Sequence, residues 1–116
     1  MPHVVHLIRD LLFVSKLREA AEPLGLDVRG TRDADACAAA ARGAALVVLD
    51  LRQPEGLRAL ERLAADPETA GVRSIGFVDH ERLDVMETAK ALGCGQVVAK
   101  GQLAVELGRA LREVRA

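Results

Sequence analysis

The stretch that decides the fold is ALVVLDLRQPEG, residues 45–56. It begins with an apolar run of Val and Leu, ends that run on one acid, Asp50, and reaches Pro54 four residues later. Continuous Val and Leu are typical of a central parallel strand that is covered on both faces, and Pro54 suits the first turn of a following helix. Asp50 therefore either caps the loop before that helix or lies in a cleft and carries chemistry.

The same alternation of short apolar segments with longer amphipathic ones runs through the whole chain. Strands are expected over 4–8, 26–30, 45–50, 73–78 and 96–100, and helices over 11–25, 33–43, 54–66, 80–93 and 101–115. Five strand–helix units with right-handed crossovers place helices on both faces of one parallel sheet. The sequence thus predicts an α/β fold, a (βα)5 doubly wound five-stranded sheet, in one domain over residues 1–116.

Composition excludes several classes of function. The net charge is −1 with acids and bases interspersed, which disfavours binding to nucleic acid or to an anionic membrane. No apolar run reaches the roughly 20 residues that span a bilayer, and no signal peptide is recognisable, so a cytoplasmic protein is expected. Cys37 and Cys94 have no metal-ligand spacing and are expected to be buried.

Polar residues follow each expected strand, where the ligand crevice of an open α/β sheet lies. These are Arg9 and Asp10, residues 30–32, Asp50, Asp79 and His80, and Lys100 and Gly101. No glycine-rich phosphate loop follows the first strand, and there is no G-x-S-x-G elbow. Dinucleotide binding and hydrolase chemistry are therefore disfavoured.

Three segments resemble response-regulator receiver domains: VVLDLRQPEGLRAL (47–60), ALGCGQVVAKG (91–101) and REAAEPLGLDV (18–28). The resemblance implies a flavodoxin-like sheet with strand order 2-1-3-4-5. It also implies phosphoryl transfer from a histidine kinase to Asp50, with Mg²⁺ held by Asp50 and an acidic pair after the first strand. In that family Lys100 would hold the phosphoryl group, and a hydroxyl and an aromatic residue would report the added charge.

The match to the family's site is partial. The acidic pair falls on Ile8 and Arg9, with Asp10 one place late, and the hydroxyl, aromatic and proline positions hold Val78, Val97 and Gly101. Any Mg²⁺ would have only Asp10 and Asp50. Arg9 is expected to pair with Asp50 in place of the metal, an attraction of roughly 4 kcal/mol at 4 Å and an effective dielectric of about 20, before desolvation.

Plainer roles stay open for the same residues. Asp10 serves equally well as the N-cap of the first helix, Arg9 could point outward, and Lys100 could be a solvated strand-end lysine. Asp79 and His80 are expected to cap the fourth helix. His6 is expected to be a packed, neutral histidine.

The sequence therefore favours a receiver-like signalling module that acts by phosphorylation-independent protein–protein contact, a pseudo-receiver that is not an enzyme and needs no cofactor. A protein partner or a second copy is expected on the face of the fourth helix, fifth strand and fifth helix. One alternative is a two-component response regulator phosphorylated on Asp50, with a histidine kinase as partner and Mg²⁺ as cofactor. Another is a small anion-binding module in which Arg9 and Lys100 flank Asp50.

Overall fold

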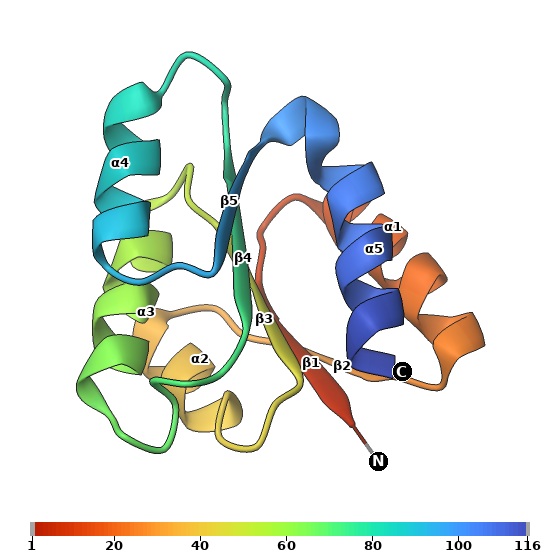
Figure 1. Ribbon diagram of the computed structural model, residues 1–116. Coiled ribbons are helices and arrows are strands. Elements are labelled where there is room, and N and C mark those ends of the chain that lie inside the picture. The colour runs from red at the N-terminus through yellow and green to blue at the C-terminus, as the bar shows by residue number, and fades with distance from the viewer. Residues whose placement is uncertain (1, 116) are drawn as a thin grey trace.

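The computed structural model describes residues 2–115 (Figure 1). Its elements, in chain order, are β1 (His3–Leu7), α1 (Leu11–Ala21), the 3-10 turn η1 (Glu22–Leu24), β2 (Asp27–Gly30), α2 (Ala34–Ala40), β3 (Leu46–Asp50), α3 (Pro54–Ala65), β4 (Ser74–Val78), α4 (Leu83–Ala91), β5 (Gln96–Ala99), the 3-10 turn η2 (Lys100–Gln102) and α5 (Leu103–Arg115). All five predicted strand–helix units are present.

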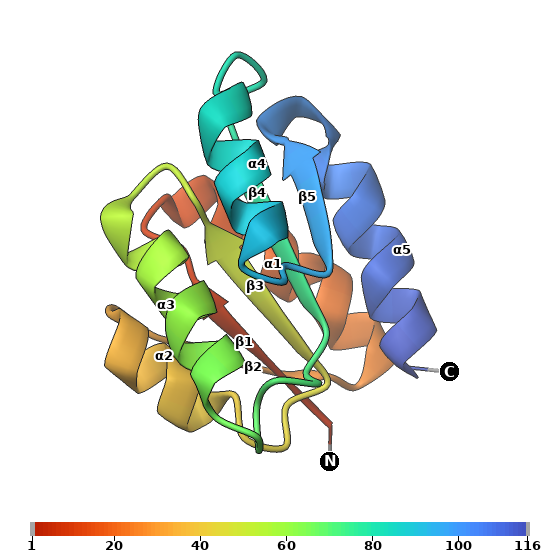
Figure 2. The ribbon, with the colours of Figure 1, turned by 60° about the vertical axis from the view of Figure 1, so that its left-hand side comes forward.

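The strands form one parallel sheet in the order β2-β1-β3-β4-β5, as predicted. Figure 1 views this sheet nearly edge-on, with α2, α3 and α4 on one face and α1 and α5 on the other. In Figure 2 the arrowheads of β3 and β5 point to the same end of the sheet. The carboxyl ends of the strands therefore share one edge.

Two apolar clusters flank the sheet, because successive strand residues point to opposite faces. Val48 packs with Phe13 and Leu107 on the side of α1 and α5, whereas Val47 packs with Cys37 and the other three helices. Every residue of β3 is buried. The predicted continuous apolar strand is thus central, and both cysteines are buried as predicted.

The helix boundaries follow local chemistry with one exception. Asp10 caps α1 by accepting the Leu12 N–H at 2.9 Å, and Pro54 begins α3. The expected capping of the fourth helix by Asp79 and His80 is wrong, since α4 begins only at Leu83. The backbone carbonyl of Asp79 instead accepts the Arg82 N–H at 3.0 Å and closes a separate turn.

No helix within residues 2–115 is both long enough and apolar enough to cross a lipid bilayer.

Candidate functional site

Asp50 is the last residue of the central strand and lies at the carboxyl edge of the sheet, beside the end of β1. It is only 3% exposed. A buried carboxylate is costly unless it is paired and hydrogen-bonded. The groups that satisfy Asp50 therefore define the chemistry of this site.

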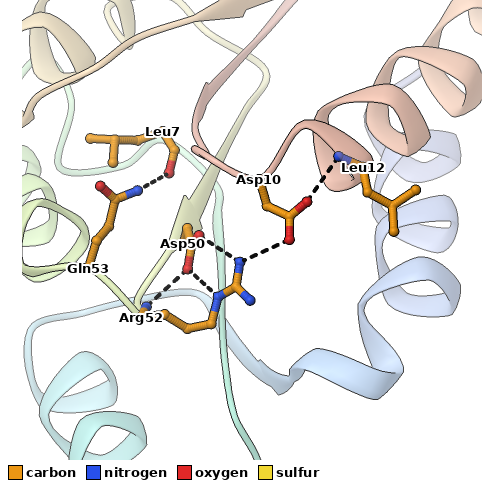
Figure 3. Close-up of polar contacts among 6 residues, drawn as sticks. All are labelled: Leu7, Asp10, Leu12, Asp50, Arg52 and Gln53. Atoms are coloured by element: carbon orange, nitrogen blue, oxygen red, sulfur yellow. Dashed lines mark hydrogen bonds and ion pairs between the residues drawn. The ribbon is translucent and has the colours of Figure 1, made fainter.

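Arg52 supplies those groups from two residues further along the chain (Figure 3). Its Nε donates to Asp50 Oδ1 at 2.9 Å and its Nη2 donates to Asp50 Oδ2 at 3.0 Å. The backbone N–H of Arg52 also donates to Oδ1, at 3.0 Å. Both carboxylate oxygens of Asp50 are thus engaged by one residue, in the bidentate geometry that suits a guanidinium.

The Arg52 guanidinium stacks on Phe13 and Phe77, the only Phe, Tyr or Trp residues of the sequence. Its central carbon lies 5.4 Å from the Phe13 ring centroid and 5.3 Å from that of Phe77. The two rings are themselves 5.1 Å apart. Stacking of this kind is favourable for arginine, so the aromatic pair fixes where the cation lies.

Two further acidic side chains, Asp10 and Asp79, lie near the Arg52 cation. Asp10 Oδ2 lies 3.7 Å from Arg52 Nη2, while its other oxygen caps α1. The hydrogen bonds to Asp50 are the main cause that raises the pKa of Arg52; burial acts in the opposite direction, and the charges of Asp50, Asp10 and Asp79 add to the increase. The site is therefore a cluster of acidic side chains neutralised by a permanently charged side chain of the protein itself.

The loop that carries Arg52 is held tightly against the strand ends. The Gln53 side chain amide donates to the Leu7 carbonyl at 3.4 Å and links the loop to β1. Gly56, in the first turn of α3, passes so close to the strand that a Cβ there would lie 2.4 Å from the Asp50 carbonyl oxygen. Arg52 is therefore attached to a short segment with little freedom to move.

The predicted ion pair between Arg9 and Asp50 is wrong. Arg9 is exposed and lines a different pocket, with Thr31 and Arg32. The physical reason is that β1 ends at Leu7, so strand alternation no longer directs the side chain of Arg9. A guanidinium does pair with Asp50, as predicted, but it belongs to Arg52 and not to Arg9.

Of the remaining predicted residues, Val78 and Lys100 lie at strand ends and Val97 lies within β5. Lys100 is exposed, and its Nζ lies 5.8 Å from the Phe13 ring centroid. Within the described residues it forms no ion pair with Asp50. Val78 is buried at the end of β4, and Val97 is partly buried in β5. Their part in signalling stays a prediction.

The arrangement does not fit the magnesium ion that the receiver fold implies. Both Asp50 oxygens accept hydrogen bonds from Arg52, and Asp10 is shared between the α1 cap and Arg52. Nowhere in residues 2–115 do three His, Cys, Asp or Glu side chains come together in a group that could hold a metal ion. A hard divalent cation prefers several free oxygen ligands, and here a guanidinium has taken them.

Comparison with known proteins agrees with the fold. No protein-family profile matches the chain, and no curated protein matches its sequence. One similar solved structure is the receiver domain of the sensor histidine kinase PA1611 from Pseudomonas aeruginosa PAO1, which has a magnesium ion coordinated in its active-site cleft. The two structures have a TM-score of 0.79 and 18% sequence identity, and the match covers 98% of this chain and 97% of that one. The receiver domain of a signal transduction histidine kinase from Syntrophus aciditrophicus has a TM-score of 0.82 and 13% identity, over 99% and 90% of the chains.

A third similar structure is the phosphorylated cyanobacterial phytochrome response regulator RcpA, with a TM-score of 0.77 and 16% identity, over 97% of this chain and 90% of that one. The protein thus has the fold of response-regulator receiver domains, with the flavodoxin-like strand order. At these identities the similarity concerns the fold. What the cleft does has to be argued from its own residues.

Proposed function

We propose that this chain is a receiver-fold signalling module that works through protein contacts and does not use phosphorylation of Asp50. The observation that carries the proposal is the bidentate pair between Arg52 and Asp50. An aspartate that attacks a phosphorus atom needs a free carboxylate oxygen. Here both oxygens are hydrogen-bonded to a cation that titration cannot remove.

The positions that would use a phosphoryl group support the same proposal. Val78 offers no hydroxyl to a phosphoryl oxygen, and Val97 has no ring that could move between two positions. A phosphate added at Asp50 would also place more negative charge beside Asp10 without a divalent cation to balance it. The site around Asp50 therefore lacks both the free metal ligands and the charge-sensing groups of a switch.

Asp50 then has a structural role. The Asp50–Arg52 pair ties the end of the central strand to the loop before α3, and stacking ties it to Phe13 of α1. The cation does what a bound metal would otherwise do for an acidic cleft, which is to neutralise it.

The proposed contact surface is the face formed by α4, β5 and α5, and its partner is another protein or a second copy of this chain. Two of the large apolar side chains that the structure leaves exposed belong to its helices: Leu83 at the start of α4 is 64% exposed, and Val105 of α5 is 67% exposed. Val97 of β5 is partly exposed as well. These side chains are the apolar groups that a partner on this surface would cover.

Incubation with Mg²⁺ and acetyl phosphate, followed by intact-mass measurement, tests the proposal. The wild-type mass is expected to stay unchanged, as is that of an Asp50→Asn control. A stable phosphate adduct on the wild type that Asp50→Asn abolishes would instead establish the alternative, a phosphorylated response regulator. Including Arg52→Ala shows whether the guanidinium is what protects Asp50.

Sedimentation velocity tests the contact surface in its self-association form. Val105→Glu is expected to abolish concentration-dependent association of the chain. Leu12→Glu is the matched control, because Leu12 is 61% exposed and lies on α1, which is not part of the proposed contact surface. Association that survives Val105→Glu but not Leu12→Glu would place the contact elsewhere.

A further inference from the structure

A second candidate site is a groove beside the ends of β1 and β2, whose lining does not include Asp50 or Arg52. It runs between the start of α1 and the carboxyl ends of β1 and β2. Two adjoining pockets form it, with volumes of about 430 and 270 Å³, and both are lined by Ile8, Leu11, Thr31 and Arg32. The larger of the two is within the size range of pockets that bind small organic ligands.

The charged side chains around this groove are all basic. Arg9 lines the larger pocket, Arg18 lines the smaller one, and Arg32 lines both. Among residues 2–115, no aspartate or glutamate lines either pocket. Within the described residues these three arginines form no ion pair. By contrast, Arg29 of the neighbouring edge strand pairs with Asp27 at 3.1 Å.

His6 lies at the floor of the smaller pocket and is 5% exposed. Burial is the main cause that lowers its pKa, followed by the charge of Arg18, so the ring is neutral at physiological pH, as the sequence predicted. The Ile8 N–H donates to Nδ1 at 3.3 Å, which leaves the ring proton on Nε2. That donor is buried and has no partner within residues 2–115.

Gly30 packs directly against this donor. A Cβ at position 30 would lie 2.8 Å from His6 Nε2, so any larger residue would have to displace the ring. The hydroxyl of Thr31 is already used, since it donates to the His6 carbonyl at 2.8 Å and anchors the strand end. The polar side chains that the groove offers to a ligand are therefore its arginines.

The rest of the lining is aliphatic. Ile8 and Val14 form part of the wall, and Leu11 is 79% exposed at its mouth. Within the part of the chain that the structure describes, no Phe, Tyr or Trp lines either pocket, and the ring of His6 is buried, so the groove offers little stacking surface for a nucleobase. A ligand that fits carries negative charge at one end and a short aliphatic chain at the other.

We propose that this groove binds a small amphipathic anion, with a phosphate or carboxylate head held by Arg9 and Arg32 and an aliphatic body packed on Ile8 and Leu11. Guanidinium groups bind both head groups through charge-assisted, bidentate hydrogen bonds. The site is separate from Asp50 and does not depend on whether Asp50 is phosphorylated.

Isothermal titration calorimetry on the whole chain with hexyl phosphate, hexanoate and hexylamine tests the proposal. Saturable binding of hexyl phosphate or hexanoate is expected, with none of hexylamine. Arg32→Gln is expected to weaken the binding about tenfold, the loss of roughly one charge-assisted hydrogen bond. Arg29→Gln, the matched control on the edge strand, should leave it unchanged.

The two anions distinguish the possible head groups. Equal affinities indicate recognition of either oxyanion, and a preference for hexyl phosphate indicates a phosphate ester as the ligand; both support the site. Amide shifts in an NMR titration should centre on Gly30 and Thr31. The proposal is overturned if neither anion binds, if Arg29→Gln weakens binding as much as Arg32→Gln, or if the shifts centre on Asp50.

Discussion

Replacing Arg52 with alanine removes the counter-ion of a carboxylate that is only 3% exposed. Two side-chain hydrogen bonds, at 2.9 and 3.0 Å, are lost together with the stacking on Phe13 and Phe77. Breaking a buried ion pair costs about 3–5 kcal/mol. The Arg52 side chain is 23% exposed, and partial screening by water reduces the expected loss of unfolding free energy to about 2–3 kcal/mol.

The double variant sharpens this prediction. Asp50→Asn removes the buried charge, so Asp50→Asn combined with Arg52→Ala should be more stable than Arg52→Ala alone. We expect a coupling free energy of about 1.5–2 kcal/mol between the two positions. Arg9→Ala is the control, because Arg9 is exposed, and it should change stability by less than about 0.5 kcal/mol.

Urea titration followed by far-UV circular dichroism measures these differences, since the chain has no Trp or Tyr for fluorescence. For a domain of this size the Arg52→Ala loss corresponds to a decrease in Tm of roughly 10 °C. The reasoning is refuted if Arg52→Ala is as stable as Arg9→Ala, or if the effects at positions 50 and 52 are additive.

Three further outcomes are expected. Gly56→Ala should destabilise the fold by more than about 2 kcal/mol, since its Cβ would lie 2.4 Å from the carbonyl oxygen that ends β3, whereas Gly101→Ala, with nothing within 4 Å, should be nearly neutral in the same urea assay. Burial lowers the pKa of His6 in the folded state; below about pH 6.5 the unfolded chain then binds a proton that the folded chain does not. Stability should therefore fall as the pH decreases through this range, with a smaller slope in His6→Gln; an equal slope would contradict this. Burial raises the pKa of Cys37 to about 11 and also raises that of Cys94, so neither thiol should react with a disulfide reagent at pH 8 until urea is added; labelling of the native chain would show that one is accessible.

The sequence predicted the fold well because strands and helices here follow strong local patterns. The Val and Leu run of 45–50 could only be a buried strand, and Asp10 and Pro54 mark helix starts by their own chemistry. The fourth helix was predicted three residues too early, since a polar turn at residues 79–82 resembles a helix start.

The site was predicted less completely. Asp50 was found because it ends an apolar run, but Arg52 was missed. Arg52 follows the strand, where no periodicity fixes the direction of a side chain. Its pairing with Asp50 depends on the local turn and on stacking against Phe13 of α1 and Phe77 of β4. One clue was available: Phe13 and Phe77 are the only aromatic residues of the chain, and both lie beneath this cation.

The central claim is that Arg52 takes the place of a metal ion at Asp50, and a magnesium titration followed by amide NMR shifts tests it most directly. The amides of Asp50, Arg52 and Gln53 in the wild type should not change at millimolar Mg²⁺, while the neighbouring amides in Arg52→Ala should show saturable shifts that Asp50→Asn abolishes. Saturable shifts of these amides in the wild-type chain would contradict the claim.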